Sequence, residues 1–140
     1  MHRNILLVLS GVLITHLALA AELPANLPAP TTRGAVTFVS GGIGLDESTA
    51  MKAAEKDYPL TLEFVVKTAS TSGYTSDVKV LLADHNGKTL LDTVSNGPFL
   101  LVKLPPGNYR LEASKDGQTK LRQVDVRAGS HQKILIEWGT

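Results

Sequence analysis

Residues 99–126 read FLLVKLPPGNYRLEASKDGQTKLRQVDV, and this stretch decides the fold class. It contains three short runs rich in apolar residues, at 99–102, 109–114 and 121–126. Pro105-Pro106-Gly107 separates the first two runs and Asp116-Gly117 separates the last two, and both are typical turn sequences. Short strands with a turn signal roughly every 8–12 residues indicate an antiparallel β-sandwich.

The same signals continue on both sides of this stretch. Alternating apolar residues predict a strand with one buried face at 60–66. An Asn-Gly pair between the runs 78–83 and 89–94 is a strong signal for a β-hairpin, and a last strand is expected at 133–138. Residues 68–77 are polar and are expected to form a loop. The sequence therefore predicts an all-β, antiparallel sandwich of about seven strands.

The start of the domain carries the one helical signal. A strand expected at 35–39 is followed by Gly41-Gly42-Ile43-Gly44, whose composition is that of a flexible turn. Asp46 suits the N-cap of a short helix that extends to about Lys56. The apolar stripe of this helix is narrow and consists of Met51, Ala54 and Tyr58. Two arrangements remain open: the helix caps the core, or it presents Met51 to a partner.

Residues 1–20 have the three parts of an export signal in the expected order. Arg3 supplies the positive start, Ile5 to Ile14 supply an apolar run, and Ala18-Leu19-Ala20 supply the cleavage pattern. Cleavage is expected before Ala21, and the periplasm or the extracellular medium is the expected location. A retained membrane anchor is the alternative, but a spanning helix needs about 20 apolar residues and this run is shorter.

Two further segments follow the signal peptide in the expected domain organisation. Residues 21–34 contain three prolines and are expected to form an extended, poorly packed spacer. Residues 35–140 are expected to form the single β-sandwich domain, since domains cluster at roughly 100–150 residues.

Composition excludes several classes of function. The chain has no cysteine, which removes disulfides, thiolate chemistry, Cys-based zinc sites and the usual bacterial lipid anchor. Lys and Arg number 14 and Asp and Glu 13, and loss of Arg3 balances them. Without a basic excess there is no electrostatic case for binding nucleic acid or an anionic membrane.

One stretch of the chain carries a family resemblance. Its most specific piece is Leu104-Pro105-Pro106-Gly107-x-Tyr109, followed by Leu111 and Ala113, within a match that covers roughly residues 60–138. This pattern resembles the carboxypeptidase regulatory-like domain, which has a transthyretin-like (prealbumin-like) β-sandwich that is also grouped with carbohydrate-binding-like folds. The whole chain is similar to short exported proteobacterial proteins that carry this domain. The resemblance implies a module that is not itself catalytic.

The residues that could carry chemistry do not form a recognised catalytic, cofactor or metal site. Gly42-x-Gly44 lacks the third glycine of a dinucleotide-binding loop, since residue 47 is Glu. His85 and His131 belong to no zinc-binding pattern and are interpreted as surface histidines. The enzyme with a transthyretin-like fold, 5-hydroxyisourate hydrolase, ends in Tyr-Arg-Gly-Ser, and this chain does not. No catalytic residue, cofactor or metal is therefore expected.

The leading hypothesis is a non-catalytic envelope module that binds or scaffolds a protein partner. A carbohydrate- or glycan-binding module is the alternative, and a transthyretin-like hydrolase is the second alternative. Trp138 is expected in the core, because it continues the face of Ile134 and Ile136, whereas Tyr74 follows Gly73 in the polar loop and is expected to be exposed. The candidate contact residues are Gly41, Gly42, Gly44, Met51 and Tyr74.

Overall fold

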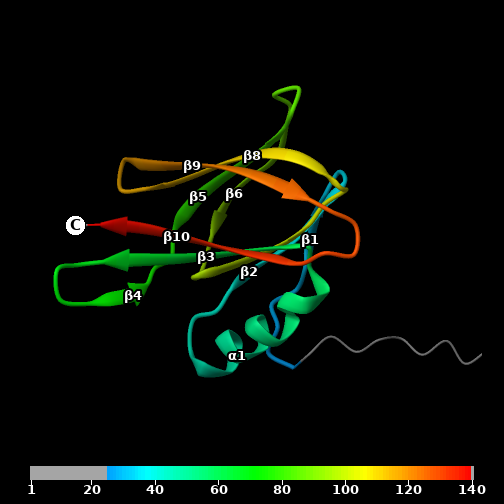
Figure 1. Ribbon diagram of the computed structural model, residues 1–140. Helices are drawn as coiled ribbons and strands as arrows, with labels where there is room; N and C mark the ends of the chain where they lie inside the picture. The colour runs from blue at the N-terminus through cyan, green and yellow to red at the C-terminus, as the bar shows by residue number, and fades with distance from the viewer. Residues whose placement is uncertain (1–24, 140) are drawn as a thin grey trace, which may run out of the picture.

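The computed structural model describes residues 25–139 and confirms the all-β class: two β-sheets are stacked, and a single α-helix lies beneath one of them (Figure 1). The expected signal peptide, residues 1–20, lies outside the described residues. The helical segments are α1 (Leu45–Ala54) and a 3₁₀ turn, η1 (Glu55–Asp57). The strands are β1 (Thr31–Arg33), β2 (Val36–Gly41), β3 (Leu60–Lys67), β4 (Ser72–Tyr74), β5 (Val78–Asp84), β6 (Thr89–Ser95), β7 (Phe99–Lys103), β8 (Gly107–Lys115), β9 (Gln118–Val126) and β10 (Gln132–Gly139).

The first sheet, sheet A, has the strand order β1-β2-β7-β3-β10, and β4 pairs with β3 beside this path. The second sheet, sheet B, has the order β6-β5-β8-β9, and all its pairs are antiparallel. The expectation of a purely antiparallel sandwich is wrong at one place, because β10 runs parallel to β3. The chain leaves sheet B after β9 and enters sheet A at the end where β3 begins. There the Gln132 N–H donates to the Pro59 carbonyl over 3.0 Å.

The ten strands in residues 25–139 exceed the expected total of about seven. Eight of them match the segments that the sequence predicts as strands, and the other two, β1 and β4, are short and carry no apolar pattern. All residues of β1 and β4 are exposed. β4 forms inside the expected polar loop 68–77, where Thr68 and Thr71 close the turn: the Thr68 N–H donates to the Thr71 carbonyl over 2.8 Å. β1 lies within the expected spacer 21–34 and pairs with β2, so the folded part begins before Ala35.

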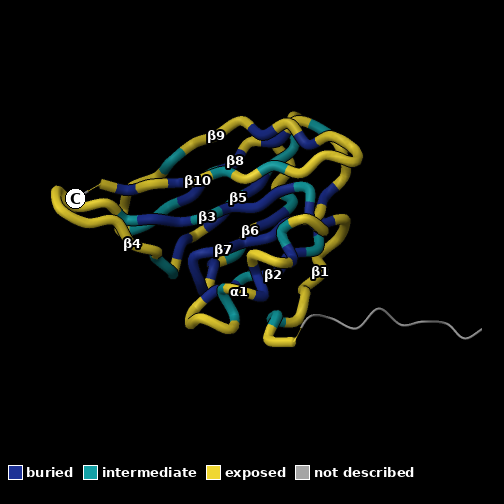
Figure 2. The backbone as a smooth tube through the Cα atoms, turned by 60° about the horizontal axis from the view of Figure 1, so that its bottom comes forward, coloured by how far each residue is buried: buried dark blue, intermediate teal, exposed yellow. Residues whose placement is uncertain are grey.

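The main core is formed by the inward side chains of both sheets. Figure 2 shows the buried segments of the strands in dark blue. Trp138 is buried there as expected, packs against Phe64 with ring centroids 6.2 Å apart, and donates from Nε1 to the Gln118 carbonyl over 3.0 Å. Tyr109, which follows the Pro-Pro-Gly turn, is also buried, and its hydroxyl donates to the Pro105 carbonyl over 2.5 Å. Both polar aromatic side chains are thus anchored by their hydrogen bonds as well as by burial.

The N-cap of helix α1 lies two residues earlier than expected, and the expected cap, Asp46, does not cap the helix. Gly44 is at the N-cap position, no side chain caps the helix there, and Asp46 lies within the first turn. The side chain of Glu47, in the first turn of the helix, binds the loop that precedes it: its Oε1 accepts a hydrogen bond of 2.8 Å from the Gly42 N–H. A carboxylate in the first turn that reaches back to a preceding amide resembles one half of a capping box.

Side chains of sheet A bond to carbonyls on both edge strands of sheet B. At one side, the guanidinium of Arg33 on β1 donates to the Asp92 carbonyl of β6 over 2.8 Å. At the other side, Gln132 and Trp138 of β10 donate to the carbonyls of Asp125 and Gln118 on β9. These contacts satisfy edge carbonyls that would otherwise be available for pairing with another strand.

Candidate functional site

The outer face of sheet A, which points away from sheet B, is apolar at its centre. Val39, Phe99 and Leu101 lie on this face and form a second buried cluster with residues of the helical segment. The helical residues of that cluster are Met51, Ala54 and Tyr58. Helix α1 and η1 therefore cap this part of the sheet, and the alternative in which Met51 is displayed does not hold in this structure, where Met51 is 0% exposed.

The apolar surface continues past the edge of the helix. The strand register places Glu63 beside Phe99 and Leu135 beside Glu63, and it places Val65 beside Tyr74 and Glu137 beside Val65. Because paired residues point to the same face of a sheet, all of these side chains lie on the outer face of sheet A. The helix thus covers only one part of a larger surface.

A shallow groove of about 340 Å³ lies on this uncovered part. We call it the Tyr74–Leu135 groove; it is lined by Glu63, Val65, Ser72, Gly73, Tyr74, Leu135 and Glu137. Tyr74 is 54% exposed and Leu135 52% exposed, whereas Val65 is 8% exposed and lies lower. Two half-exposed apolar side chains therefore border a buried apolar floor, and two carboxylates are the charged groups among the lining residues.

Phe99 connects this groove to the helix and to the glycine-rich loop. Its ring lies 5.3 Å from the Tyr74 ring, centroid to centroid. The Lys52 ammonium of α1 lies 5.6 Å from the Tyr74 ring centroid and 5.8 Å from that of Phe99. Gly42 has φ of 104° and lies against the same Phe99 ring, where a β-carbon would clash. The loop, the helix and the β3–β4 hairpin therefore meet at one buried ring.

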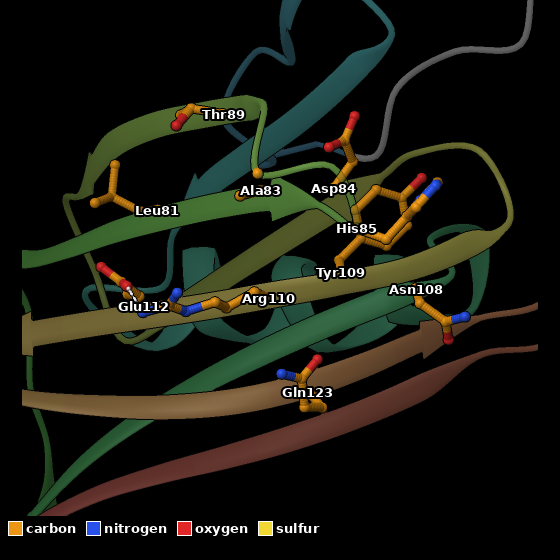
Figure 3. Close-up of a pocket in the computed structure, with 11 residues that line it drawn as sticks. Leu81, Ala83, Asp84, His85, Thr89, Asn108, Tyr109, Arg110, Glu112 and Gln123 are labelled. Carbon is orange, nitrogen blue, oxygen red and sulfur yellow. Dashed lines mark hydrogen bonds and ion pairs between the residues drawn. The ribbon is translucent and has the colours of Figure 1, made fainter.

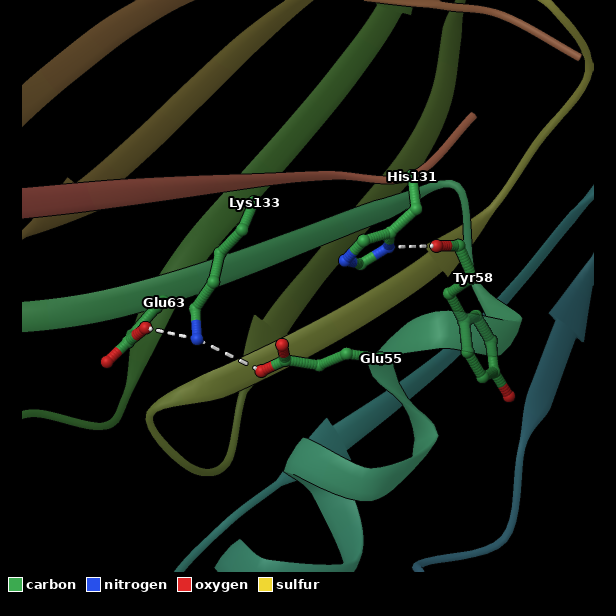
Figure 4. Close-up of polar contacts among 5 residues, drawn as sticks. All are labelled: Glu55, Tyr58, Glu63, His131 and Lys133. Atoms are coloured by element: carbon green, nitrogen blue, oxygen red, sulfur yellow. Dashed lines mark hydrogen bonds and ion pairs between the residues drawn. The ribbon is translucent and has the colours of Figure 1, made fainter. Parts of the chain in front are cut away.

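Lys133 fixes the end of the helix to the sheet beside the groove (Figure 4). Its ammonium contacts Glu63 over 2.8 Å and Glu55 over 3.1 Å, so it joins β10, β3 and η1. Burial alone would lower the pKa of Lys133, but the hydrogen bonds and charges of Glu63 and Glu55 outweigh it and raise this pKa above its usual value. Lys133 is therefore protonated at neutral pH, and its two ion pairs link η1 to sheet A at the border of the groove.

The structure brings most of the expected contact residues to one region but gives them different roles. Gly41 and Gly42 are buried and Gly44 is exposed, and the loop they form lies beside Phe99. Met51 is a core residue. Tyr74 is exposed, as expected, and is the member of this set that lines the groove.

Of the residues that line the groove, only Tyr74 was proposed from the sequence as a contact residue; Phe99 and Leu135 show why the others in this region were missed. Phe99 was assigned to a strand without a functional role, and nothing in the local sequence shows that the Tyr74 ring packs against it. Leu135 did leave a signal: Ile134, Ile136 and Trp138 form the inward face of β10, so Leu135 is an apolar residue at an outward position.

The outer face of sheet B has a larger hollow, of about 480 Å³, beneath the 84–88 turn (Figure 3). Its floor over β5 includes Ala83, and its side chains are largely polar. Arg110 and Glu112 form an ion pair of 2.7 Å across this floor. The ring of Tyr109 is buried, and both burial and the nearby charge of Asp84 raise its pKa. No exposed aromatic side chain borders this hollow within the described residues.

A third hollow, of about 360 Å³, lies at the end of the sandwich between η1 and the β9–β10 turn. His131 lies there, and its Nδ1–H donates to the Tyr58 carbonyl over 2.7 Å, since a carbonyl only accepts (Figure 4). Burial, and then the charge of Asp57, raise the pKa of the Tyr58 hydroxyl. His85 lies apart, on the sheet B side. Over residues 25–139, no group of three or more His, Cys, Asp or Glu side chains could hold a metal ion.

Comparison with known proteins adds no assignment. No protein-family model matches the chain, and no curated protein matches it significantly. Within the part of the chain that the structure describes, no helix is both long enough and apolar enough to cross a membrane.

Proposed function

We propose that this protein is a non-catalytic, exported envelope module that binds a segment of a protein partner in the Tyr74–Leu135 groove. The observation that carries the proposal is the apolar surface of sheet A that extends past helix α1. Tyr74 and Leu135 stay half exposed on it, on either side of Val65. Single exposed apolar residues are ordinary, but neighbouring ones around a hollow are typical of an interaction site.

The groove favours a protein segment over a glycan. Glycan-binding faces commonly offer several exposed aromatic rings, on which sugar rings stack, and in residues 25–139 Tyr74 is the only exposed aromatic side chain. The hollow on sheet B is polar and has no exposed ring. A groove bordered by one tyrosine and one leucine is better suited to the side chains of a polypeptide.

Carbonyls on both edge strands of sheet B already accept side-chain hydrogen bonds, and this affects how a partner can bind. The cross-sheet contacts of Arg33, Gln132 and Trp138 occupy edge carbonyls of β6 and β9. A partner is therefore expected to bind mainly through side chains in the groove, with little strand addition to these edges.

Export and family remain part of this proposal and rest on the sequence. The segment 1–20 supports export through its ordered signal-peptide features, and the Pro-Pro-Gly-x-Tyr piece supports a carboxypeptidase regulatory-like domain. The separation of His85 and His131 into different hollows supports a non-catalytic role, because the two imidazoles could not act together on one substrate.

Site-specific photocrosslinking tests the proposal in the cells that produce the protein. A photoreactive phenylalanine analogue replaces Leu135 in one variant and Leu121 in the other; the two leucines lie on edge strands of opposite sheets and are 52% and 53% exposed. We expect a discrete protein adduct from position 135 and none of comparable yield from position 121. Equal adducts from both positions, or none from 135, would contradict the proposed site.

A further inference from the structure

The side chains of the groove are arranged in rows across β4, β3 and β10, and this arrangement limits which partner segments can bind. Tyr74 on β4, Val65 on β3 and Glu137 on β10 are register partners and form one row. Neighbouring strands lie about 4.8 Å apart, so the backbones that carry Tyr74 and Glu137 are about 10 Å apart, with the lower Val65 between them. An aromatic ring and a carboxylate therefore face each other across an apolar floor.

The next row has a different character. It runs from Phe99 through Glu63 to Leu135, and Glu63 is already neutralised by Lys133. The surface that this row offers to a partner is thus the exposed side chain of Leu135. The two rows are two residues apart along β10, which corresponds to about 6.6 Å in an extended strand.

Glu137 is the charge in the groove without a counterion. Among residues 25–139 it makes no ion pair, whereas Glu63 and Glu55 share Lys133. The lining residues include no cation. Lys52 and Lys133 lie at the border and contact the Phe99 ring, and the exposed Lys67 lies on the same face in the row beyond Val65, without an ion pair to Glu137 within residues 25–139. The electrostatic complement of this groove is therefore a cationic side chain.

Resting on the function proposed above, we propose that the groove recognises an extended, basic segment in which an Arg or Lys and an apolar residue are two positions apart. The basic side chain lies across the first row, with its stem on Val65 and its cation at Glu137. Arg fits best, because its planar guanidinium can bind the Glu137 carboxylate through two hydrogen bonds while its aliphatic stem packs on Val65 beside the Tyr74 ring. The apolar residue at the i+2 or i−2 position then contacts Leu135, because alternate side chains of an extended segment point to one side.

The test uses three acetylated, amidated heptapeptides and the isotope-labelled protein, with binding followed through backbone amide chemical shifts. The probe has the sequence Gly-Ser-Arg-Thr-Leu-Ser-Gly. A spacing control exchanges Thr and Leu, and a charge control has Glu in place of Arg. We expect the probe to shift the amides of Val65, Tyr74, Leu135 and Glu137, and both controls to bind at least about threefold more weakly, as expected for loss of one exposed contact.

Two matched variants test whether the Glu137 carboxylate is the group that binds the basic side chain of the peptide. Glu137→Gln is expected to weaken binding of the probe about two- to fivefold, the size of an exposed ion pair. Asp92→Asn, an exposed acidic residue on β6 without an ion pair in the described part of the chain, is expected to leave binding unchanged. Equal affinity for the Glu peptide, or equal effects of the two variants, overturns the proposal.

The remaining outcomes separate this inference from the proposed function. Absence of any peptide binding, together with an adduct from position 135, overturns the basic segment and leaves the groove as a binding site. Dilution of the protein alone that shifts the same four amides identifies a second copy as the occupant and also overturns the proposal. Failure of the adduct at position 135 overturns the proposed function itself, whatever the peptides do.

Discussion

The two outer faces of this sandwich are built in opposite ways. On sheet A, β7 is buried from Phe99 to Val102, so its side chains are covered on both faces, and helix α1 provides the outer cover. On sheet B, β8 alternates between buried and more exposed residues, and its outward positions carry groups such as Arg110 and Glu112. The apolar outer face of sheet A must therefore be buried by other residues, whereas the polar outer face of sheet B is stable in contact with water.

This difference explains why the groove is where it is. An apolar outer face must be buried by something, and the apolar side chains of the helical segment pack on β2 and β7. Toward β4 and β10 this segment extends only the charged side chains of Lys52 and Glu55. The uncovered remainder carries Tyr74 and Leu135, whereas the outer face of sheet B is bordered by polar groups and a bound ion pair. The apolar surface left by the short helix is therefore the best candidate for contact with another chain.

The covered part of sheet A gives the largest expected effect. Met51→Asp places a carboxylate in the buried cluster beside Phe99 and should lower the free energy of unfolding by ~2–5 kcal/mol, through lost packing and an unpaired buried charge. Ala53→Asp makes a similar change on the exposed side of the same helix and should cost less than about 1 kcal/mol. Denaturant unfolding of both variants measures the difference, and equal losses would show that the helix does not cap the sheet.

Much of this fold was predictable because buried strands leave an apolar pattern. The alternation at 60–66, the Asn-Gly hairpin and the Pro-Pro-Gly turn all gave strands close to their observed limits. β1 and β4 left no such pattern, since their stability comes from backbone pairing and their side chains are exposed.

The candidate site was predictable only in part, for a related physical reason. Tyr74 could be expected at the surface from its polar neighbours, but its contact with Phe99 depends on strand register. The parallel pairing of β10 with β3, which places Leu135 and Glu137 beside the groove, depends on how the chain crosses between sheets. Local sequence carries no information on either.

A smaller effect is expected for the tie between the helix and the sheet. Lys133→Gln removes the contacts with Glu63 and Glu55 and should lower the free energy of unfolding by less than about 1 kcal/mol, because the lysine side chain is 38% exposed and screened by water. Lys79→Gln, at an exposed outward position of sheet B, should have no measurable effect.

The pH dependence of this tie has a definite sign. The pKa of Lys133 is raised in the folded protein, because the hydrogen bonds and charges of Glu63 and Glu55 outweigh the opposing effect of burial. The stabilisation is therefore complete below the unfolded value of about 10.4 and is lost as the pH rises through the folded pKa. The difference between wild type and Lys133→Gln should be constant from about pH 7 to 9 and should shrink above about pH 10.4. A difference that already shrinks below pH 9 would contradict this account.

Substitution of the two exposed leucines, Leu135 and Leu121, is expected to have the smallest effect on stability. It is also the most direct test of the claim that the partner binds in the Tyr74–Leu135 groove. Leu135→Ser and Leu121→Ser should each change the free energy of unfolding by less than about 0.5 kcal/mol, because both side chains are about half exposed. The measurement is competition of each purified variant against the photocrosslinking protein for its partner. The account predicts that Leu121→Ser competes as well as wild type and that Leu135→Ser competes at least about tenfold less well. Equal competition by the two variants would contradict it.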